Sequence, residues 1–354
     1  MSITPPTDGA VMSSSTPTIV VTGATGFLGG HILDALRAQP VHLVAAVRDT
    51  SRLPSWFEGD TRVGDLTDPD YRRTVVRGAD VVIHAGTWSS FWGHPREERE
   101  RFEVPHLDLI DQSVAAGAGR FIAASTVALG TPATGASLVP DDSPAHGRAF
   151  WPHHVAMTRV ESHMRDVALH GNTNMVSLRL GHFIGQGNAL GLVAALIPRL
   201  KTRQVPWVDH GRAHLPLVSG ADMGRAFALA ATVDTARLSS FESINIVGAE
   251  QPTAREVFTR IASSAGVPLP AYSVPTRAAY GFATMMEALH PVLPGRAPFL
   301  TRSLVFVGEN WHMADTKARD LLGYAGSDDW REVVDASVLD RRAGGYAWPA
   351  LAQA

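Results

Sequence analysis

Three glycines near the start of the sequence have a spacing that suits phosphate binding. Gly23, Gly26 and Gly29 stand in the pattern Gly-x-x-Gly-x-x-Gly, after the apolar run TIVVT and before a segment of helical periodicity. Glycines let the backbone turn tightly and approach a pyrophosphate, and a helix N-terminus adds unpaired N–H groups and a positive dipole end. The strand-turn-helix context therefore predicts a dinucleotide-binding loop.

The residues after the second apolar run bear on which dinucleotide would bind. HLVAAV ends at residue 47 and is followed by Arg48, Asp49 and, three positions on, Arg52. An acidic side chain here would hold a free ribose 2′-hydroxyl, whereas a guanidinium pairs bidentately with a 2′-phosphate. The arginines favour NADP(H) over NAD(H). Asp49 keeps NAD(H) open, and solvated arginines without a ligand are the plainer alternative.

Short apolar runs alternate with longer helical segments, which is the pattern of βαβ units on a parallel sheet. The predicted core strands are 18–22, 42–47, 80–85, 120–125 and 175–180, with a later strand at 243–247. The predicted amphipathic helices are 27–39, 104–117 and 155–171. The predicted fold class is α/β, with a Rossmann-type, doubly wound parallel sheet.

The composition of the sequence changes after about residue 183. Proline and aromatic residues become more frequent there, and predicted strands become rarer. We expect a disordered leader at 1–16, a dinucleotide-binding domain of 17–183 and 214–248, and a smaller, interleaved substrate domain of 184–213 and 249–354. The leader lacks a basic start and a continuous apolar run, so we do not interpret it as a secretory signal. A cytoplasmic location is the expectation.

Composition narrows the classes of partner. The 354 residues carry a formal net charge of −3 and no cysteine. Nucleic acid or an anionic membrane would need a basic surface, and no segment approaches membrane-spanning length. His210 and His214 have a spacing seen in metal sites, but Gly211 between them indicates a loop and no glutamate completes a metalloprotease pattern. We therefore expect a small-molecule substrate and no metal.

The chain from residue 17 to about 345 resembles the extended short-chain dehydrogenase/reductase family, nearest to its NAD(P)-dependent epimerase/dehydratase, 3β-hydroxysteroid dehydrogenase and dihydroflavonol reductase group. TGATGFLGG resembles the family's phosphate loop, GDLTD at 64–68 its adenine-side segment, and IHAGT at 83–87 its nicotinamide-side strand end. ADMGRAFALA, INIVG and KARDLLGY resemble its C-terminal markers. The resemblance implies dinucleotide contacts from Thr22, Gly23, Thr25, Gly26, Phe27, Leu28, Gly29, Arg48, Asp65, Leu66, Ala85, Gly86, Thr87 and Arg159.

The family's catalytic residues are a Ser or Thr at a strand end and a Tyr-x-x-x-Lys pair on the next helix. FIAASTVALG resembles the serine segment and places Ser125 on the catalytic serine, with Thr126 beside it. TRVES resembles the family's Ser-Lys-x-Glu-Ala register, which places Arg159 on the lysine and Val155 on the tyrosine. None of the five tyrosines of the chain lies on this predicted helix.

Valine cannot move a proton, and arginine can hydrogen-bond a ribose but relays protons poorly because its pKa exceeds ~12. The resemblance therefore implies that cofactor binding is kept while the usual acid–base device is lost. His154 adjoins the vacant position and is the expected replacement, although one helical residue is a turn of about 100° and would aim it away unless the helix starts irregularly. His153 and His182 are the further candidates.

Aromatic residues gather in two segments that line the substrate side in the family, WSSFWGHP at 88–95 and AFWPHH at 149–154. They contribute Trp88, Phe91, Trp92, Phe150 and Trp151, and Phe183 and Trp207 are further candidates. Such a cluster suits a flat, apolar ligand such as a polyketide, steroid-like or flavonoid-like molecule, unless the rings are core residues. The predicted pocket comprises Trp88, Trp92, Thr126, Trp151, His153, Val155, His182 and Phe183.

Three functions compete at this stage. The first is an NADP(H)-dependent oxidoreductase acting on a carbonyl or secondary alcohol, with Ser125, Arg159 and either His154 or water as its chemical groups. The second is a non-redox isomerase, lyase or cyclase that reuses the pocket, and the third is a non-catalytic dinucleotide sensor or partner subunit. Helices 103–117 and 154–170 resemble the family's dimer-forming helices, so a homodimer is expected in each case.

Overall fold

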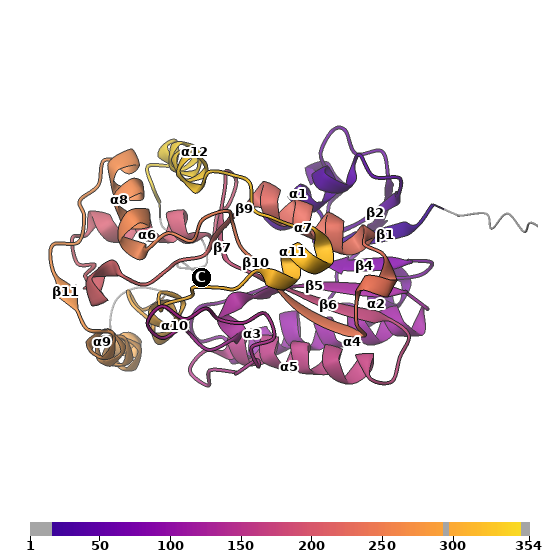
Figure 1. Ribbon diagram of the computed structural model, residues 1–354, viewed down its shortest axis with the longest axis horizontal. Coiled ribbons are helices and arrows are strands. Elements are labelled where there is room, and N and C mark those ends of the chain that lie inside the picture. Colours follow the sequence, from indigo (N-terminus) through magenta and orange to yellow (C-terminus); the bar gives the residue numbers. More distant parts are fainter. Residues whose placement is uncertain (1–15, 293–296, 348–354) are drawn as a thin grey trace, which may run out of the picture.

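A parallel sheet of seven strands lies at the centre of the larger part of the molecule (Figure 1). The computed structural model describes residues 16–292 and 297–347. The strands are ordered β10-β6-β5-β4-β1-β2-β3. Their bounds are β1 (Thr18–Thr22), β2 (His42–Val47), β3 (Asp60–Val63), β4 (Val81–His84), β5 (Arg120–Thr126), β6 (Asn174–Leu180) and β10 (Phe241–Ile246). This order and the helices on both faces confirm the predicted Rossmann-type α/β fold.

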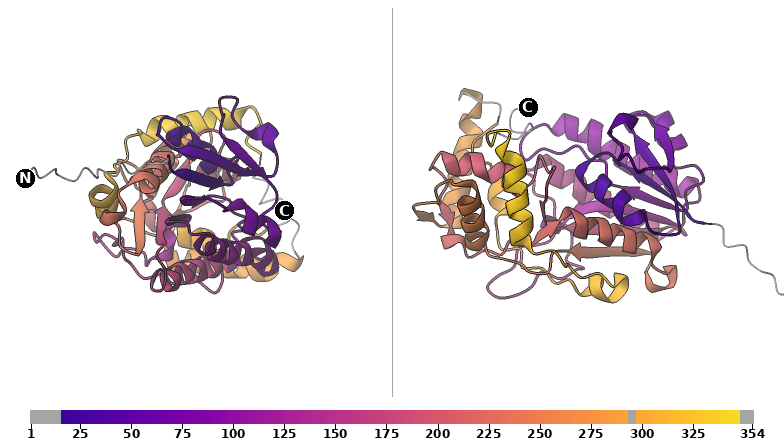
Figure 2. Two further views of the ribbon diagram at one scale, coloured as in Figure 1. Left: turned by 90° about the vertical axis from the view of Figure 1, so that its right-hand side faces the viewer. Right: turned by 90° about the horizontal axis from the view of Figure 1, so that it is seen from above.

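Helices cover both faces of this sheet (Figure 2). One face carries α1 (Phe27–Leu36), α7 (Gly220–Thr232) and α11 (Thr316–Leu322). The other carries α2 (Pro69–Val75), α4 (Val104–Ala115) and α5 (Pro152–Ala168). Successive strand residues alternate between the two cores, so Ile19 and Val21 pack with α1 and α7 while Val20 packs on the opposite side. Burial on both faces explains why the central strands are short, nearly continuous apolar runs.

A smaller group of elements lies at the carboxyl edge of the sheet, on the left of Figure 1. Its helices are α6 (Leu192–Lys201), α8 (Ala254–Ala265), α9 (Thr276–Leu289), α10 (Arg302–Val307) and α12 (Trp330–Arg342). Two short parallel pairs join them, β7 (His182–Ile184) with β9 (Leu217–Ser219) and β8 (Trp207–Val208) with β11 (Ser273–Val274). Helices α6, α8 and α12 share one apolar core.

Short helical turns connect these elements. Within residues 16–292 and 297–347, the 3-10 turns are η1 (Thr50–Arg52), η3 (Val127–Leu129), η4 (Asp209–Gly211), η5 (Thr235–Arg237) and η6 (His290–Val292). Before α4, the helix α3 (Pro95–Glu98) runs into a π-helical turn, η2 (Arg99–Glu103). Such π-turns inside helices occur often at functional sites.

Helix α5 begins at Pro152, three residues before the predicted start. Proline suits the first helical position because its fixed φ matches the helix and its missing N–H would have had no partner there. Trp151 precedes it in an extended conformation, and no irregularity is found in the first turn. His153, His154 and Val155 are therefore ordinary helical residues that point in different directions around the axis.

Three further features concern the predicted leader, membrane-spanning helices and metal-binding groups. Residues 1–15 of the predicted 1–16 leader lie outside the described residues. No helix in 16–292 or 297–347 is long and apolar enough to cross a membrane. Within the same ranges, no group of three or more His, Cys, Asp or Glu side chains is arranged to hold a metal ion.

Candidate active site

The glycine loop between β1 and α1 is built by close backbone packing. Gly23 has φ +67°, and a Cβ added to it would lie 2.5 Å from the Cα of Gly86, just past the end of β4. A Cβ on Gly29 would lie 2.1 Å from the carbonyl oxygen of Gly23. Gly26 caps α1 with no side-chain hydrogen bond, so the N–H groups of the first turn remain available. These residues fit a dinucleotide pyrophosphate.

The other loop residues divide into supports and exposed positions. Thr22 is fully buried and its hydroxyl bonds to the Nδ1 atom of His84 at 2.5 Å. Leu28, in the first turn of α1, packs into the core, and the ring of Phe27 lies close to Gly185, beyond β7. Thr25 is half-buried at the turn. Buried residues thus hold the loop in place, and Gly26 is exposed to solvent.

The segment after β2 presents cations and a carboxylate that is already occupied. The carboxylate of Asp49 accepts hydrogen bonds from the Ser51 N–H and the Ser51 hydroxyl, each at 2.9 Å. The N–H first, and the hydroxyl second, hold the pKa of Asp49 below its usual value. Arg48 and Arg52 are exposed, and neither makes an ion pair or side-chain hydrogen bond in the part of the chain that is described.

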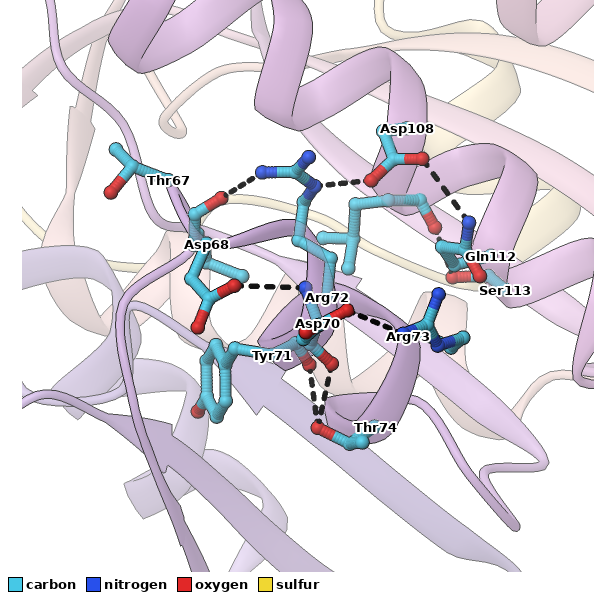
Figure 3. A network of polar contacts seen from close by, with 12 residues as sticks. Thr67, Asp68, Asp70, Tyr71, Arg72, Arg73, Thr74, Asp108, Gln112 and Ser113 are labelled. Carbon is cyan, nitrogen blue, oxygen red and sulfur yellow. Dashed lines mark hydrogen bonds and ion pairs between the residues drawn. The ribbon is translucent and has the colours of Figure 1, made fainter.

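The adenine-side segment is held by a polar network between α2 and α4 (Figure 3). The guanidinium of Arg72 donates to the Leu66 carbonyl at 2.6 Å and pairs with Asp108 of α4, which also accepts from Gln112. The carboxylate of Asp65 accepts from the N–H and hydroxyl of Thr67. The backbone of residues 65–68 is therefore fixed without any ligand, which leaves its outer edge free to contact one.

Ser125 lies near the carboxyl end of β5 and faces α5. Phe121 and Ala123 pack in the core with α4 and α5, so Ser125, at the same phase of the strand, points to that side. It lines a small cavity together with Met157 and Val160 of α5. The neighbouring Thr126 instead caps η3, where its hydroxyl accepts from the Ala128 N–H. Ser125 is thus the hydroxyl whose hydrogen-bonding capacity is available.

The two positions that the resemblance aligns with the Tyr-x-x-x-Lys pair, Val155 and Arg159, lie on α5 one turn apart. Val155 is half-buried and adjoins the preceding loop, since a Cβ on Gly147 would lie 3.4 Å from its Cα. Arg159 is exposed and donates from Nη1 to both carboxylate oxygens of Glu103, each at 3.0 Å. The side chain of Glu103 itself is 14% exposed, so this pair anchors the guanidinium beside η2.

His154 does not suit the proton-donor role that its position suggested. The side chain is fully buried, Nδ1 accepts from the Arg148 N–H at 3.1 Å, and Nε2 donates to the Ala128 carbonyl at 2.8 Å. Burial lowers its pKa to about 4, partly offset by the bond to Ala128. Both ring nitrogens are used by the backbone, because the regular helix turns His154 away from Val155 and into the protein. The geometry therefore argues against a catalytic His154.

His153 and His182 are also held by neighbours. Nδ1 of His153 bonds to the buried carboxylate of Glu98 at 2.9 Å, and Glu98 also accepts from the Ser90 N–H. His182 bonds to the backbone of Val307, while its Nε2 is buried without a partner among the described residues. Burial lowers the pKa of His182 to about 4, so its ring is neutral at pH 7. Neither His153 nor His182 is among the described residues that line the cavity beside Ser125.

The aromatic residues predicted to line the pocket have different places. Trp151 is 5% exposed, stacks on His154 and donates its indole N–H to the Ser90 carbonyl, so it is a core residue. Trp207 is buried beside Phe258, within the smaller group of elements. The remaining positions are less buried: Ala85, Gly86, Trp88, Trp92, Phe150 and Phe183 are half-buried, and Thr87 and Phe91 are exposed.

Several residues of the site belong to no recognisable sequence motif. Glu98, Glu103 and His106 come from α3, η2 and α4, and Gly147 from the loop before α5. Their roles arise only when these segments meet around Ser125 and Val155. A charged residue in a helical segment normally indicates a solvated face, so the sequence held no signal that Glu98 is buried.

A family model decides the relationship. The model of the NAD dependent epimerase/dehydratase family matches residues 19–246. The chain belongs to this family. Among the relatives, the 4-hydroxy-2-methyl-3-oxo-4-farnesyl-3,4-dihydroquinoline-1-oxide ketoreductase of Stigmatella aurantiaca is 24% identical over 333 residues, covering 93% of this chain and 98% of the relative.

A second full-length relative is the 3-diazoavenalumate denitrifying reductase of a Streptomyces species, 26% identical over 325 residues, covering 89% of this chain and 98% of the relative. Among solved structures, gox2253 superposes with a TM-score of 0.75 at 21% identity, covering 94% and 99% of the two chains. MoeE5 in complex with UDP-glucuronic acid and NAD superposes with a TM-score of 0.67 at 20% identity, covering 92% and 99%. These likenesses extend the shared fold beyond the family model, and the chain is an enzyme of the epimerase/dehydratase type.

Proposed function

We propose that the chain binds NADP(H) and transfers hydride between the nicotinamide and a carbonyl or secondary alcohol of an aromatic or polycyclic small molecule. The observation that carries the proposal is the position of Ser125. Its side chain lies at the end of β5, beside β4, whose continuation at Gly86 packs against the Gly23 turn. In doubly wound sheets, ligands bind outside the carboxyl ends of the strands where the strand order reverses, which here lies between β1 and β4.

The preference for NADP(H) rests on the residues after β2. Both carboxylate oxygens of Asp49 accept hydrogen bonds from Ser51, which orients this carboxylate toward its own loop. Arg48 and Arg52 are exposed beside it. A 2′-phosphate would give these two guanidinium groups an anionic partner.

The chemical groups of the site suit a reaction without tyrosine. The bound nicotinamide would supply or accept the hydride. The Ser125 hydroxyl hydrogen-bonds the substrate oxygen, and Arg159, anchored by Glu103, binds the cofactor ribose. Val155 offers no proton and His154 has no free nitrogen. In this proposal water therefore delivers the proton to the substrate oxygen.

The substrate class is proposed from the aromatic rings that follow β4 and from the relatives. Trp88 and Trp92 follow the nicotinamide-side strand end, and Phe91 stacks on Trp151 with 5.4 Å between ring centroids. Aromatic faces of this kind favour flat ligands. One full-length relative is named for a dihydroquinoline that carries a ketone, which supports a fused-ring carbonyl substrate.

The first test is a fluorescence titration of the purified protein with NADPH and NADH. We expect tighter binding of NADPH, and we expect Arg48→Ala and Arg52→Ala each to weaken NADPH binding about tenfold to a hundredfold, because a charged hydrogen bond contributes ~1.5–3 kcal/mol. NADH binding should change little. Arg96→Ala, which removes an exposed arginine paired with Glu100, is the matched control.

Turnover is then followed by nicotinamide absorbance across a panel of aromatic ketones and alcohols. Substrate-dependent oxidation of NADPH, or reduction of NADP⁺, is the expected result. Tight NADPH binding with no hydride transfer across the whole panel would contradict the oxidoreductase.

Val155 favours a second candidate, a non-redox isomerase, lyase or cyclase of the same pocket. Without a tyrosine, the site lacks the usual group that protonates or deprotonates a substrate oxygen during hydride transfer. A product of unchanged oxidation state, formed without consumption of nucleotide, would identify this alternative.

We further propose a homodimer formed through α4 and α5. The outer surface of these helices includes Val104, which is 45% exposed, and a contact between them from His163 to Asp111 at 2.7 Å. A sizing column with light scattering tests the proposal, and elution as a monomer at all concentrations would contradict it.

A further inference from the structure

A small cavity lies behind Ser125, between the sheet and the helices α4 and α5. The centre of a water-sized sphere can occupy about 10 Å³ of it. Its lining includes Ser125 of β5, Ser177 of β6, His106 and Phe102 from the α4 side, and Glu161 of α5. A cavity of this size accommodates about one water molecule, provided that polar partners are present.

His106 lines this cavity and has two polar ring atoms. It is 2% exposed, and neither ring nitrogen has a hydrogen-bond partner within residues 16–292 and 297–347. Rings surround it: His84 at 4.2 Å between centroids, Phe102 at 5.3 Å and Phe121 at 6.2 Å. Buried polar groups are nearly always hydrogen-bonded to protein or to ordered water. Because His106 lines the cavity, an ordered water there would supply a partner for one of its ring nitrogens.

The protonation of His106 is fixed by its surroundings. Burial first, and the nearby rings of His84, His153 and His163 next, hold its pKa well below the usual value. The ring is neutral at pH 7 and carries one N–H donor and one acceptor nitrogen. A water molecule can accept from that N–H and keep both of its own hydrogens for other groups.

The remaining polar groups of the cavity are already paired. The carboxylate of Glu161 accepts from the Ser177 hydroxyl at 2.9 Å and from two nitrogens of Arg179, at 3.0 Å and 2.5 Å. For Ser125, by contrast, no side-chain hydrogen bond is found in the described part of the chain. A water molecule that is hydrogen-bonded to His106 would therefore have Ser125 Oγ as an acceptor for one of its own hydrogens.

We propose that His106 is a positioning residue that holds one water molecule against Ser125 Oγ. The water accepts from the His106 N–H and donates to Ser125, which occupies a lone pair of Oγ and leaves the hydroxyl proton directed at the substrate oxygen. This role rests on the proposed function. The orientation of the Ser125 hydroxyl matters here because Val155 replaces the tyrosine that would otherwise also hydrogen-bond the substrate oxygen.

The structural test uses the full-length protein. In a high-resolution crystal structure we expect one ordered water within about 2.6–3.2 Å of both a His106 nitrogen and Ser125 Oγ. The ¹⁵N shifts of the His106 ring should show a neutral imidazole whose water-facing nitrogen carries the proton. A cavity without ordered water, or a His106 ring bonded elsewhere, would overturn the proposal.

The kinetic test uses the substrate and NADPH from the panel described above. His106→Leu should lower kcat about tenfold with little change in KM for NADPH, and His106→Gln, which keeps a donor, should restore most of the rate. In a Ser125→Ala background, His106→Leu should have no further effect, because the two residues act through one water. A general packing defect would instead lower the rate of both backgrounds equally.

The two proposals can fail separately. If His106→Leu lowers kcat further in the Ser125→Ala background, the water-mediated role is wrong while hydride transfer remains established. If the wild-type protein turns over no substrate in the panel, the oxidoreductase proposal fails, and the crystal structure and the ¹⁵N shifts still decide whether His106 holds a water on Ser125.

Discussion

Val155 is the position that the resemblance to the family aligns with the catalytic tyrosine, and a tyrosine placed there tests what such a group would add. A positioned general acid typically contributes 10²–10⁴-fold in rate. We predict that Val155→Tyr combined with Arg159→Lys raises kcat for ketone reduction at least about tenfold. The gain is smaller than the full range because the loop at Gly147 lies against Val155 and must move to admit a ring. Steady-state kinetics with saturating NADPH measure the effect.

The matched control for this change is Val155→Phe with Arg159→Lys, which adds the same ring without a hydroxyl. Equal rates for the phenylalanine and tyrosine variants would mean that the position does not face the substrate oxygen. A rate gain confined to tyrosine would show that a hydroxyl at this position reaches the substrate oxygen.

At the scale of elements, α5 is tied to the sheet by a buried ion pair. Arg179 of β6 and Glu161 of α5 are 1% and 3% exposed, and Arg179 also donates to the Ser143 carbonyl at 2.7 Å. Removing one member of such a pair leaves an uncompensated buried charge and costs ~3–5 kcal/mol. We predict that Glu161→Gln lowers the free energy of unfolding by about 3 kcal/mol, as measured by urea denaturation.

An exposed pair on α3 and η2 provides the comparison. Arg96 and Glu100 are 84% and 59% exposed, so Glu100→Gln should change the free energy of unfolding by less than about 0.5 kcal/mol. Similar losses for Glu161→Gln and Glu100→Gln would contradict the assignment of Glu161 as the anchor of α5.

The sequence predicted these elements unevenly, for physical reasons. β1 and β2 were predicted to the residue because they are buried runs bounded by turns. β3 was missed, since Asp60–Val63 is an edge strand with three exposed residues and no apolar run. The start of α5 was predicted three residues late, and the regular first turn of the helix directs His154 away from Val155. Ser125 and the glycine loop followed from motifs, whereas Glu103 and His106 depend on how distant segments meet.

At the scale of the whole molecule, buried neutral histidines make the fold sensitive to acid. Burial lowers the pKa of His84, His154 and His182 to about 4, against about 6.5 when unfolded. The unfolded chain binds these protons first, so the stability that the neutral rings contribute is complete above pH ~6.5 and is lost as the pH falls toward ~4. We predict a melting temperature that falls steeply between pH ~6.5 and ~4.5.

Replacing one of these rings separates the histidine contribution from that of the carboxylates. His154→Gln should be less stable than the wild type at pH ~7.5, because the hydrogen bonds with Arg148 and Ala128 are disturbed. Its melting temperature should nevertheless fall less between pH ~6.5 and ~5, because one group that protonates only on unfolding has been removed. Carboxylates with lowered pKa values, such as Asp49 and Asp65, protonate at lower pH and affect both proteins alike. Parallel curves for the two proteins would therefore show that His154 is not held neutral by its burial.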